Sequence, residues 1–162
     1  MTFREYQFET RRTANGDYDR AYDLANYALG LVDESIEMEC AGSCELLDEC
    51  SDVLWYAARI ADVCGLDFDA VHERSKTQMN YEPSLMLAMR IGEMSKKVMF
   101  QGHPLDREKM MEYLSSLLGE LAEMLEGYYD WSLEAAIEHN VAKLRKRYPD
   151  GFEATRSINK TN

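Results

Sequence analysis

The sequence predicts an all-α protein, a single-domain bundle of about six to seven helices, and three observations support that prediction. Apolar residues recur at helical spacing along nearly the whole chain, and almost no stretch alternates apolar with polar residues as a half-buried strand would. Only three prolines and nine glycines interrupt the 162 residues. The apolar fraction of 46% is sufficient for a sizeable core in a chain of this length.

Helices are expected at about 3–14, 18–39, 44–64, 68–80, 84–100, 106–128 and 132–147. The breaks between them have chemical causes. Asn15-Gly16-Asp17 is a turn followed by a cap, Gly42-Ser43 separates two helices, and Gly102-His103-Pro104 cannot continue a helix. Asp106 can cap the next helix, and Pro149-Asp150-Gly151 ends the last one. The polar residues 153–162 are expected to form a loose tail.

A faint internal duplication divides the chain into two helical repeats, at about 18–80 and 84–152. Asp48–Leu54 aligns with Glu112–Leu118 at an offset of 64, and Val32-Asp33-Glu34 aligns with Ile91-Gly92-Glu93. Leu66-Asp67-Phe68 also resembles Trp131-Ser132-Leu133, one residue further out. Any two amphipathic hairpins could share similarity this weak, but the order of three elements favours a duplication.

The charge balance restricts the partners of the protein. Lys and Arg number 18 against 30 Asp and Glu, a formal net charge of −12. Such a chain lacks the cationic field needed to bind a nucleic acid polymer, but a phosphate ligand held through metal ions remains compatible. The most apolar stretch, Val53–Leu66, contains Arg59 and Asp62 and is too short to cross a bilayer. A cytoplasmic protein without membrane partners is expected.

The four cysteines, Cys40, Cys44, Cys50 and Cys64, form no CxxC motif. No histidine lies beside them at finger-like spacing, so a zinc site is disfavoured. We expect them to be small buried apolar residues in a reducing compartment.

Two pairs of acidic residues form the most informative motif. Glu34 and Glu37 lie three apart on one expected helix, and Glu49 and Asp52 lie three apart on the next. Each pair shares a helix face, and a short connection makes the two helices antiparallel neighbours. Four facing carboxylates require a cation, and oxygen ligands suit Mg²⁺ or Mn²⁺. The alternative is a solvated helix face; Glu49 borders an apolar stripe, whereas helical periodicity gives Glu34 and Glu37 no such support.

These residues resemble the MazG-like, all-α nucleoside triphosphate pyrophosphohydrolases. The resemblance rests on Glu34-x-x-Glu37 followed by Glu49-x-x-Asp52-Val53-Leu54-Trp55-Tyr56, and on the ending Asn140–Phe152. It extends to Glu5-Tyr6-Gln7, Arg12-Thr13-Ala14 and Phe100–Asp106, so it covers nearly the whole chain.

The resemblance implies an enzyme of the MazG-like fold that cleaves a nucleoside triphosphate to the monophosphate and pyrophosphate, in control of nucleotide pools. Glu34, Glu37, Glu49 and Asp52 would be its catalytic Mg²⁺ ligands. Asn140, Lys143 and Arg147 would hold phosphates, although cations in a last helical turn also favour the helix dipole. Tyr56, with Trp55 and Tyr27, could stack on the base or belong to the core. The family also implies a homodimer or higher homo-oligomer.

The sequence departs from the family pattern in two ways. The second repeat keeps Glu93 but has Lys96, Tyr113 and Ser116 at the other acid positions, so only the first repeat should hold metal. Asp33 also replaces a common glycine, and the gap between the acidic pairs is short. A non-catalytic helical interaction or nucleotide-sensing module is therefore the alternative function.

Overall fold

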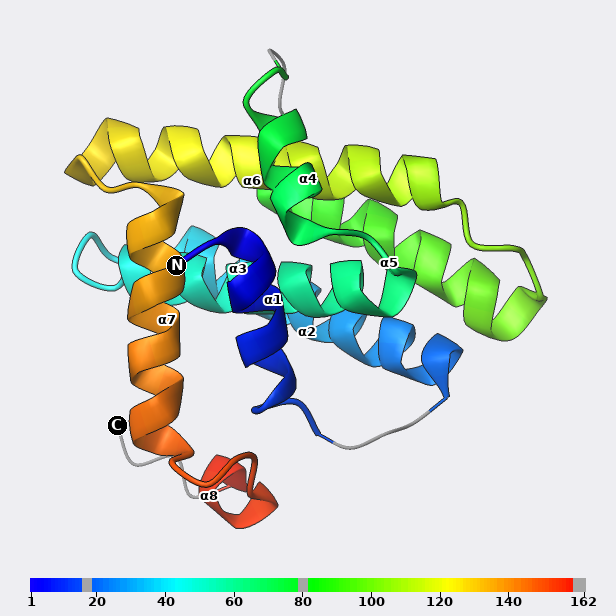
Figure 1. The fold of residues 1–162 in the computed structure, drawn as a ribbon. Helices are drawn as coiled ribbons and strands as arrows, with labels where there is room; N and C mark the ends of the chain where they lie inside the picture. The colour runs from blue at the N-terminus through cyan, green and yellow to red at the C-terminus, as the bar shows by residue number, and fades with distance from the viewer. Residues whose placement is uncertain (16–18, 79–81, 159–162) are drawn as a thin grey trace.

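A computed structural model describes residues 1–15, 19–78 and 82–158. These residues form eight helices and no strand (Figure 1), which confirms the all-α class. The helices are α1 (Phe3–Arg11), α2 (Arg20–Cys40), α3 (Leu46–Cys64), α4 (Phe68–Ser75), α5 (Ser84–Gln101), α6 (Arg107–Tyr129), α7 (Leu133–Arg147) and α8 (Ala154–Ile158). The seven longer helices match the expected number, and α8 is additional.

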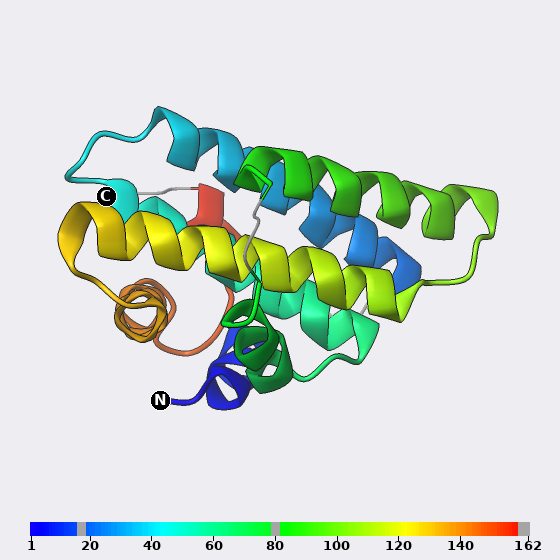
Figure 2. The same ribbon diagram turned by 90° about the horizontal axis from the view of Figure 1, so that it is seen from above.

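Four long helices make the body of the molecule. Helix α2 packs on α3 and α5, and α6 packs on α5 and α3, so the four surround one core (Figure 2). Helix α1 lies against α3, α4 and α7. The bundle interior is aliphatic, and its largest side chains are almost fully excluded from water, among them Leu24, Leu31, Leu54, Ile60, Leu87, Ile91, Leu114 and Leu117.

The sequence determines where several helices begin and end. Asp67, Asp106 and Ser132 each accept a backbone hydrogen bond in the first turn of α4, α6 and α7, respectively. Gly65 and Gly102 follow α3 and α5 with φ angles of 67° and 68°, a left-handed conformation that glycine favours because it has no Cβ. The break predicted at Gly102-His103-Pro104 and the cap predicted at Asp106 are therefore confirmed.

The third helix of each predicted repeat crosses to the other repeat. Helix α7 packs against α3, and α4 packs against α6. Residues late in the chain are thereby brought onto the first hairpin, where the acidic motif lies. This exchange is the arrangement expected of two related copies, and the duplication itself stays an interpretation of the sequence.

Several local expectations differ from the structure. Helix α1 ends at Arg11 and α4 at Ser75, earlier than expected, and Gly16, Asp17 and residues 79–80 lie outside the described residues. The predicted tail contains α8, while 159–162 are not described. Cys50 and Cys64 are buried as expected, but Cys40 and Cys44 are exposed because they border the α2–α3 turn. Within the described part of the chain, no helix is both long and apolar enough to span a membrane.

Candidate metal centre

The first step in building the site is the close contact between α2 and α3. Gly30 lies against Tyr56, and a Cβ at that position would be only 2.1 Å from the tyrosine ring. A glycine therefore allows the ring to pack directly on the backbone of α2. Glu34 follows Gly30 by one helical turn on the same face, so the same contact directs Glu34 toward α3.

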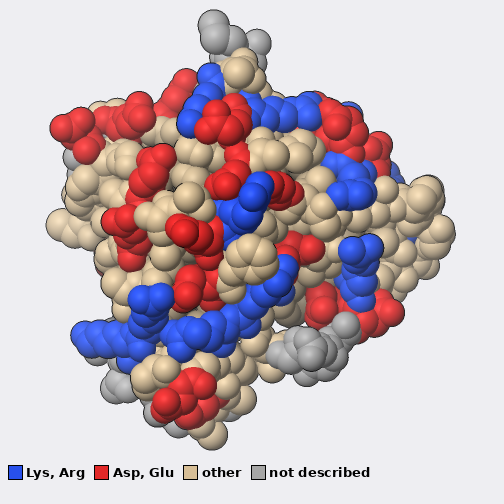
Figure 3. Space-filling view, in the orientation of Figure 1, with Lys and Arg blue, Asp and Glu red and all other residues tan. Residues whose placement is uncertain are grey.

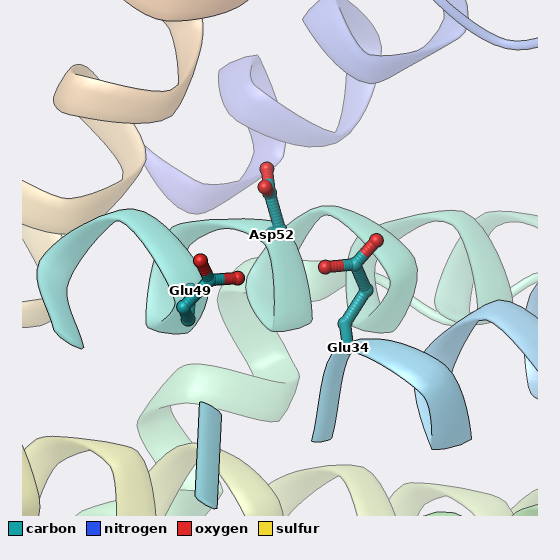
Figure 4. A group of neighbouring side chains, drawn as sticks. All are labelled: Glu34, Glu49 and Asp52. Carbon is teal, nitrogen blue, oxygen red and sulfur yellow. The ribbon is translucent and has the colours of Figure 1, made fainter. Parts of the chain in front are cut away.

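Glu34, Glu49 and Asp52 form the candidate metal centre. Each offers a carboxylate oxygen, and these oxygens lie within 4.8 Å of one another. Figure 4 shows Glu34 reaching from α2 toward the two acids of α3. All three side chains are half-buried. Burial raises the pKa of Glu49, and the charges of Asp52 and Glu37 add to that effect, so a cation would relieve real repulsion here.

Glu37, the fourth predicted ligand, is not a member of this group. It is exposed on α2, one turn beyond Glu34, although its charge still acts on Glu49. The donor set fits a small hard cation, because it consists of carboxylate oxygens on two rigid helices with room for water ligands.

Helix α7 supplies the partners of Asp52. Asn140 Nδ2 donates to Asp52 Oδ1 at 3.1 Å, and Lys143 Nζ donates to Asp52 Oδ2 at 2.8 Å. The two predicted phosphate ligands therefore meet a predicted metal ligand. Their spacing of three residues places both on the side of α7 that faces α3.

Asn140 is fully buried, and a small polar network fixes its orientation. Its Oδ1 accepts a hydrogen bond from the Tyr6 hydroxyl at 2.8 Å, and its Nδ2 also donates to Ser51 Oγ at 3.3 Å. A buried amide without hydrogen-bond partners would destabilise the fold, so this network holds Asn140 in one orientation. Asn140 is therefore a rigid support for Asp52. A phosphate-binding role for Asn140 stays a prediction.

Asp48 and His139 are residues of this region that the sequence reasoning missed. His139 Nε2 lies 2.8 Å from Asp48 Oδ1, and Lys143 Nζ lies 3.2 Å from the same oxygen. Burial would raise the pKa of Asp48, but His139 and Lys143 outweigh it and hold that pKa below its ordinary value. Two spacings could have revealed the pairing: Asp48 precedes Asp52 by four residues, and His139 precedes Lys143 by four.

A cavity of about 150 Å³ opens beside the acids. Glu34 and Asp52 contribute to its wall, and so does Arg147, the third predicted phosphate ligand. Tyr56 lines it too; burial, together with the charges of Glu34 and Asp52, raises the pKa of Tyr56 to about 12, so it stays a neutral phenol. The remaining wall combines aromatic, aliphatic and hydroxyl side chains, from Thr13, Trp55, Leu144, Tyr148, Phe152 and Ser157.

The chain beyond α7 forms the outer wall of this cavity and is tied to the end of α1. Phe152 N donates to the carbonyl of Arg12 at 3.3 Å, and Arg12 Nη1 donates to the carbonyl of Pro149 at 3.1 Å. The rings of Tyr148 and Phe152 are 5.6 Å apart. A hydrogen bond to the residues just after α1 also orients Trp55: its Nε1 donates to Thr13 Oγ1 at 3.0 Å.

Charge is separated on this face of the molecule. Figure 3 shows a band of Lys and Arg side chains across the lower part of the view, around the end of α7, with acidic side chains above it. The last turn of α7 carries Arg145, Lys146 and Arg147. An otherwise acidic protein thus presents cations beside the candidate centre, where they can attract an anion.

The counterpart positions of the second repeat do not form an acidic cluster. Glu93 pairs with Lys97 at 2.8 Å, and Lys96 is exposed. The ammonium of Lys109 lies over the Tyr113 ring, and Ser116 Oγ donates to Gln78 Oε1 at 2.5 Å. Within the described residues, the metal-compatible group occurs in the first repeat alone.

Comparisons with protein-family models, with curated proteins and with solved structures found no match for this chain. The resemblance to the MazG-like enzymes therefore remains an interpretation of sequence motifs.

Proposed function

We propose that the protein is a Mg²⁺-dependent nucleoside triphosphate pyrophosphohydrolase that cleaves a triphosphate to the monophosphate and pyrophosphate. The proposal rests chiefly on one observation, the approach of carboxylate oxygens of Glu34, Glu49 and Asp52 to within 4.8 Å. Magnesium, or manganese in its place, would supply an activated water and would neutralise charge on the phosphates.

The residues around the acids support a phosphorylated substrate. Lys143 and Arg147 come from one face of α7, and both lie beside carboxylates of the cluster. In this proposal they hold the phosphate chain, with Asn140 keeping Asp52 in place. Acids alone would repel a triphosphate, and nearby cationic side chains, together with the metal, would offset that repulsion.

The cavity supports a nucleotide rather than a simple polyphosphate. Trp55, Tyr56, Tyr148 and Phe152 surround a space that is continuous with Glu34 and Asp52. A flat heterocycle stacks favourably on such rings, so a base could lie there while its phosphates reach the acids.

Hydrolysis with a matched pair of variants tests the proposal. The purified chain is incubated with a panel of dNTPs and MgCl₂, and pyrophosphate release is measured. Glu34→Gln should lower kcat/KM more than about 100-fold, because a ligand to the metal contributes several kcal/mol to transition-state stabilisation. Glu93→Gln, at the counterpart position in the second repeat, should change it by less than about twofold, as an exposed substitution.

Two results would reject the enzyme. One is the absence of pyrophosphate from every triphosphate in the panel. The other is a Glu34→Gln variant that cleaves as fast as Glu93→Gln, which would show that the acids do not carry the reaction.

The second candidate, a helical interaction or nucleotide-sensing module without turnover, is favoured by the contact of Lys143 with Asp52. An internal ammonium already neutralises one acid, which would leave that acid paired in a site without metal. Isothermal titration with MgCl₂ separates the enzyme from an interaction module, because a degenerate module should show no heat of binding that Glu34→Gln removes. Binding of metal and nucleotide without pyrophosphate release would identify a sensor.

A further inference from the structure

Lys143 contacts the acidic cluster through one of its members, Asp52. Its ammonium lies 2.8 Å from Asp52 Oδ2 and 3.2 Å from Asp48 Oδ1, and the side chain is only 14% exposed. Lys143 is therefore held in specific ion pairs with Asp52 and Asp48 and is not a solvated surface lysine.

The two oxygens of Asp52 have different partners. Oδ1 accepts from Asn140, a fully buried amide held by Tyr6 and Ser51. Oδ2 accepts from Lys143. The amide is fixed and the lysine sits on a flexible stem, so Oδ2 is the oxygen that can be given to a metal.

Asp48 offers Lys143 a second anchor outside the cluster. The ammonium is already within 3.4 Å of the Asp48 backbone carbonyl as well as near its carboxylate. His139 contacts that carboxylate at 2.8 Å and keeps it in place. A small movement of the lysine can therefore exchange Asp52 for Asp48 without leaving the ammonium unpaired.

We propose that Lys143 is a built-in counter-cation of the metal centre, an inference that rests on the proposed function. While no metal is bound, Lys143 neutralises Asp52. A divalent cation competes with it for Oδ2, and metal entry releases the ammonium toward Asp48 and toward an incoming phosphate. The metal and the phosphate-binding lysine are thereby coupled through one carboxylate.

The coupling predicts opposite effects of one substitution on two ligands. Lys143→Met keeps the apolar stem and removes the charge. Magnesium should then bind roughly tenfold more tightly, because a unit positive charge a few ångströms away no longer opposes it. A non-hydrolysable triphosphate at saturating Mg²⁺ should bind more weakly, because the released ammonium is missing. Lys96→Met, at an exposed position of α5 in the second repeat, should alter neither affinity.

Calorimetric titrations of the wild-type chain and of both variants measure these affinities. Equal Mg²⁺ affinity in wild type and Lys143→Met would overturn the competition, while metal binding itself, and so the proposed function, would stand. Tighter binding of both ligands would overturn the release step. Absence of Mg²⁺ binding from wild type and variant alike would instead remove the basis of the proposed function.

A measurement on the wild-type chain covers the case in which Lys143→Met does not fold. An amine-reactive reagent is applied with and without saturating MgCl₂, and labelled lysines are quantified by peptide mass spectrometry. Labelling of Lys143 should rise with the metal, and labelling of Lys146 should stay constant. An unchanged rate at Lys143 in a chain that binds Mg²⁺ would contradict its release.

Discussion

The junctions of α7 with α3 and of α4 with α6 have corresponding positions and different chemistry. In the first, Lys143 donates to Asp52; in the second, Gln78 and Ser116 form the hydrogen bond. These residues correspond in the repeat alignment, since Ser116 follows Asp52 by 64 positions and Lys143 follows Gln78 by 65. A neutral amide and hydroxyl therefore satisfy this junction, which means that packing alone does not require a carboxylate and an ammonium.

The difference separates structural from chemical demands. Partly buried ion pairs often add little net stability over neutral partners, because desolvation opposes the attraction between the charges. The charges of the first junction thus need a reason beyond stability. Their neighbours, Glu34 and Glu49, supply one in the proposed function, since a metal requires the carboxylate and a phosphate requires the ammonium.

The largest effect is expected when the first junction is converted to the chemistry of the second. The double variant Asp52→Ser, Lys143→Gln should keep the helical circular dichroism spectrum of the parent. Under the proposed function it should lose metal binding and more than about 100-fold in hydrolysis, because a proposed metal ligand and a proposed phosphate ligand disappear together. Activity close to that of the parent would show that the charged pair serves the fold after all.

Asp52→Ser alone sharpens the same comparison. It removes one of the two carboxylates that Lys143 contacts and leaves Asp48, so the variant should unfold more easily than the double variant by about 0.5–1 kcal/mol in urea denaturation. Equal stability of the single and double variants would contradict the coupling of the two side chains.

A smaller effect is expected from two glycines, one on each hairpin. Gly30→Ala would place a methyl group in steric overlap with the Tyr56 ring. The substitution should therefore destabilise the fold by about 1–3 kcal/mol and displace Tyr56, which lines the cavity. Gly92, on α5, has no neighbour within 4 Å of such a Cβ. Gly92→Ala should stabilise by about 0.5–1 kcal/mol through helix propensity, and thermal denaturation reports both changes.

If Gly30→Ala is as stable as the parent, Tyr56 does not depend on close packing against α2. The same result would weaken the argument that this contact brings Glu34 toward α3.

The smallest effect concerns the pH dependence of stability through Glu120 on α6. Burial, together with the charge of Glu39, raises the pKa of Glu120 to about 7, and its Oε2 is buried without a hydrogen-bond partner. In the unfolded chain the carboxyl titrates near 4.5. At pH values between these two pKa values, Glu120 is protonated in the folded state and ionised in the unfolded state. The free energy of unfolding should therefore fall as pH rises from about 5 to 7.

Glu120→Gln should abolish this fall and leave the variant more stable above pH 7, by about 1 kcal/mol once partial solvent screening is allowed for. Urea denaturation across that pH range measures it. A variant with the same slope as the parent would assign the pH dependence to other groups. The contrast with Asp52 is direct, because there an ammonium neutralises the carboxylate and here a proton does.

The sequence was sufficient for the all-α class and for most helix boundaries, because the periodic apolar residues and the caps are local signals. Asp67, Asp106 and Ser132, for example, are residue types that favour the start of a helix, and each caps one here. The early end of α1 could not be predicted, since the residue that follows the helix, Arg12, contacts Pro149 and Phe152, which are far away in the sequence.

The candidate site was predictable only in part, for the same physical reason. The spacing of Glu49 and Asp52 is a property of one helix, and their approach to Glu34 follows from a short turn. The exposure of Glu37 depends on which face of α2 packs against α3, and the contact of Gly30 with Tyr56 sets that face. The spacing of the acids does not determine it. The roles of Asp48, His139 and Tyr6 require knowing that α7 and α1 pack on α3.

The contact between the two ends of the chain has a consequence for biosynthesis. The acids are synthesised with the first hairpin, whereas Lys143, Tyr148 and Phe152 follow Asp52 by 91 residues or more. The cavity therefore cannot close before Phe152 has been synthesised, because its outer wall requires Phe152 to reach Arg12. Contacts this distant in sequence form slowly, so under the proposed function nucleotide affinity should appear only after this late segment has docked on the end of α1.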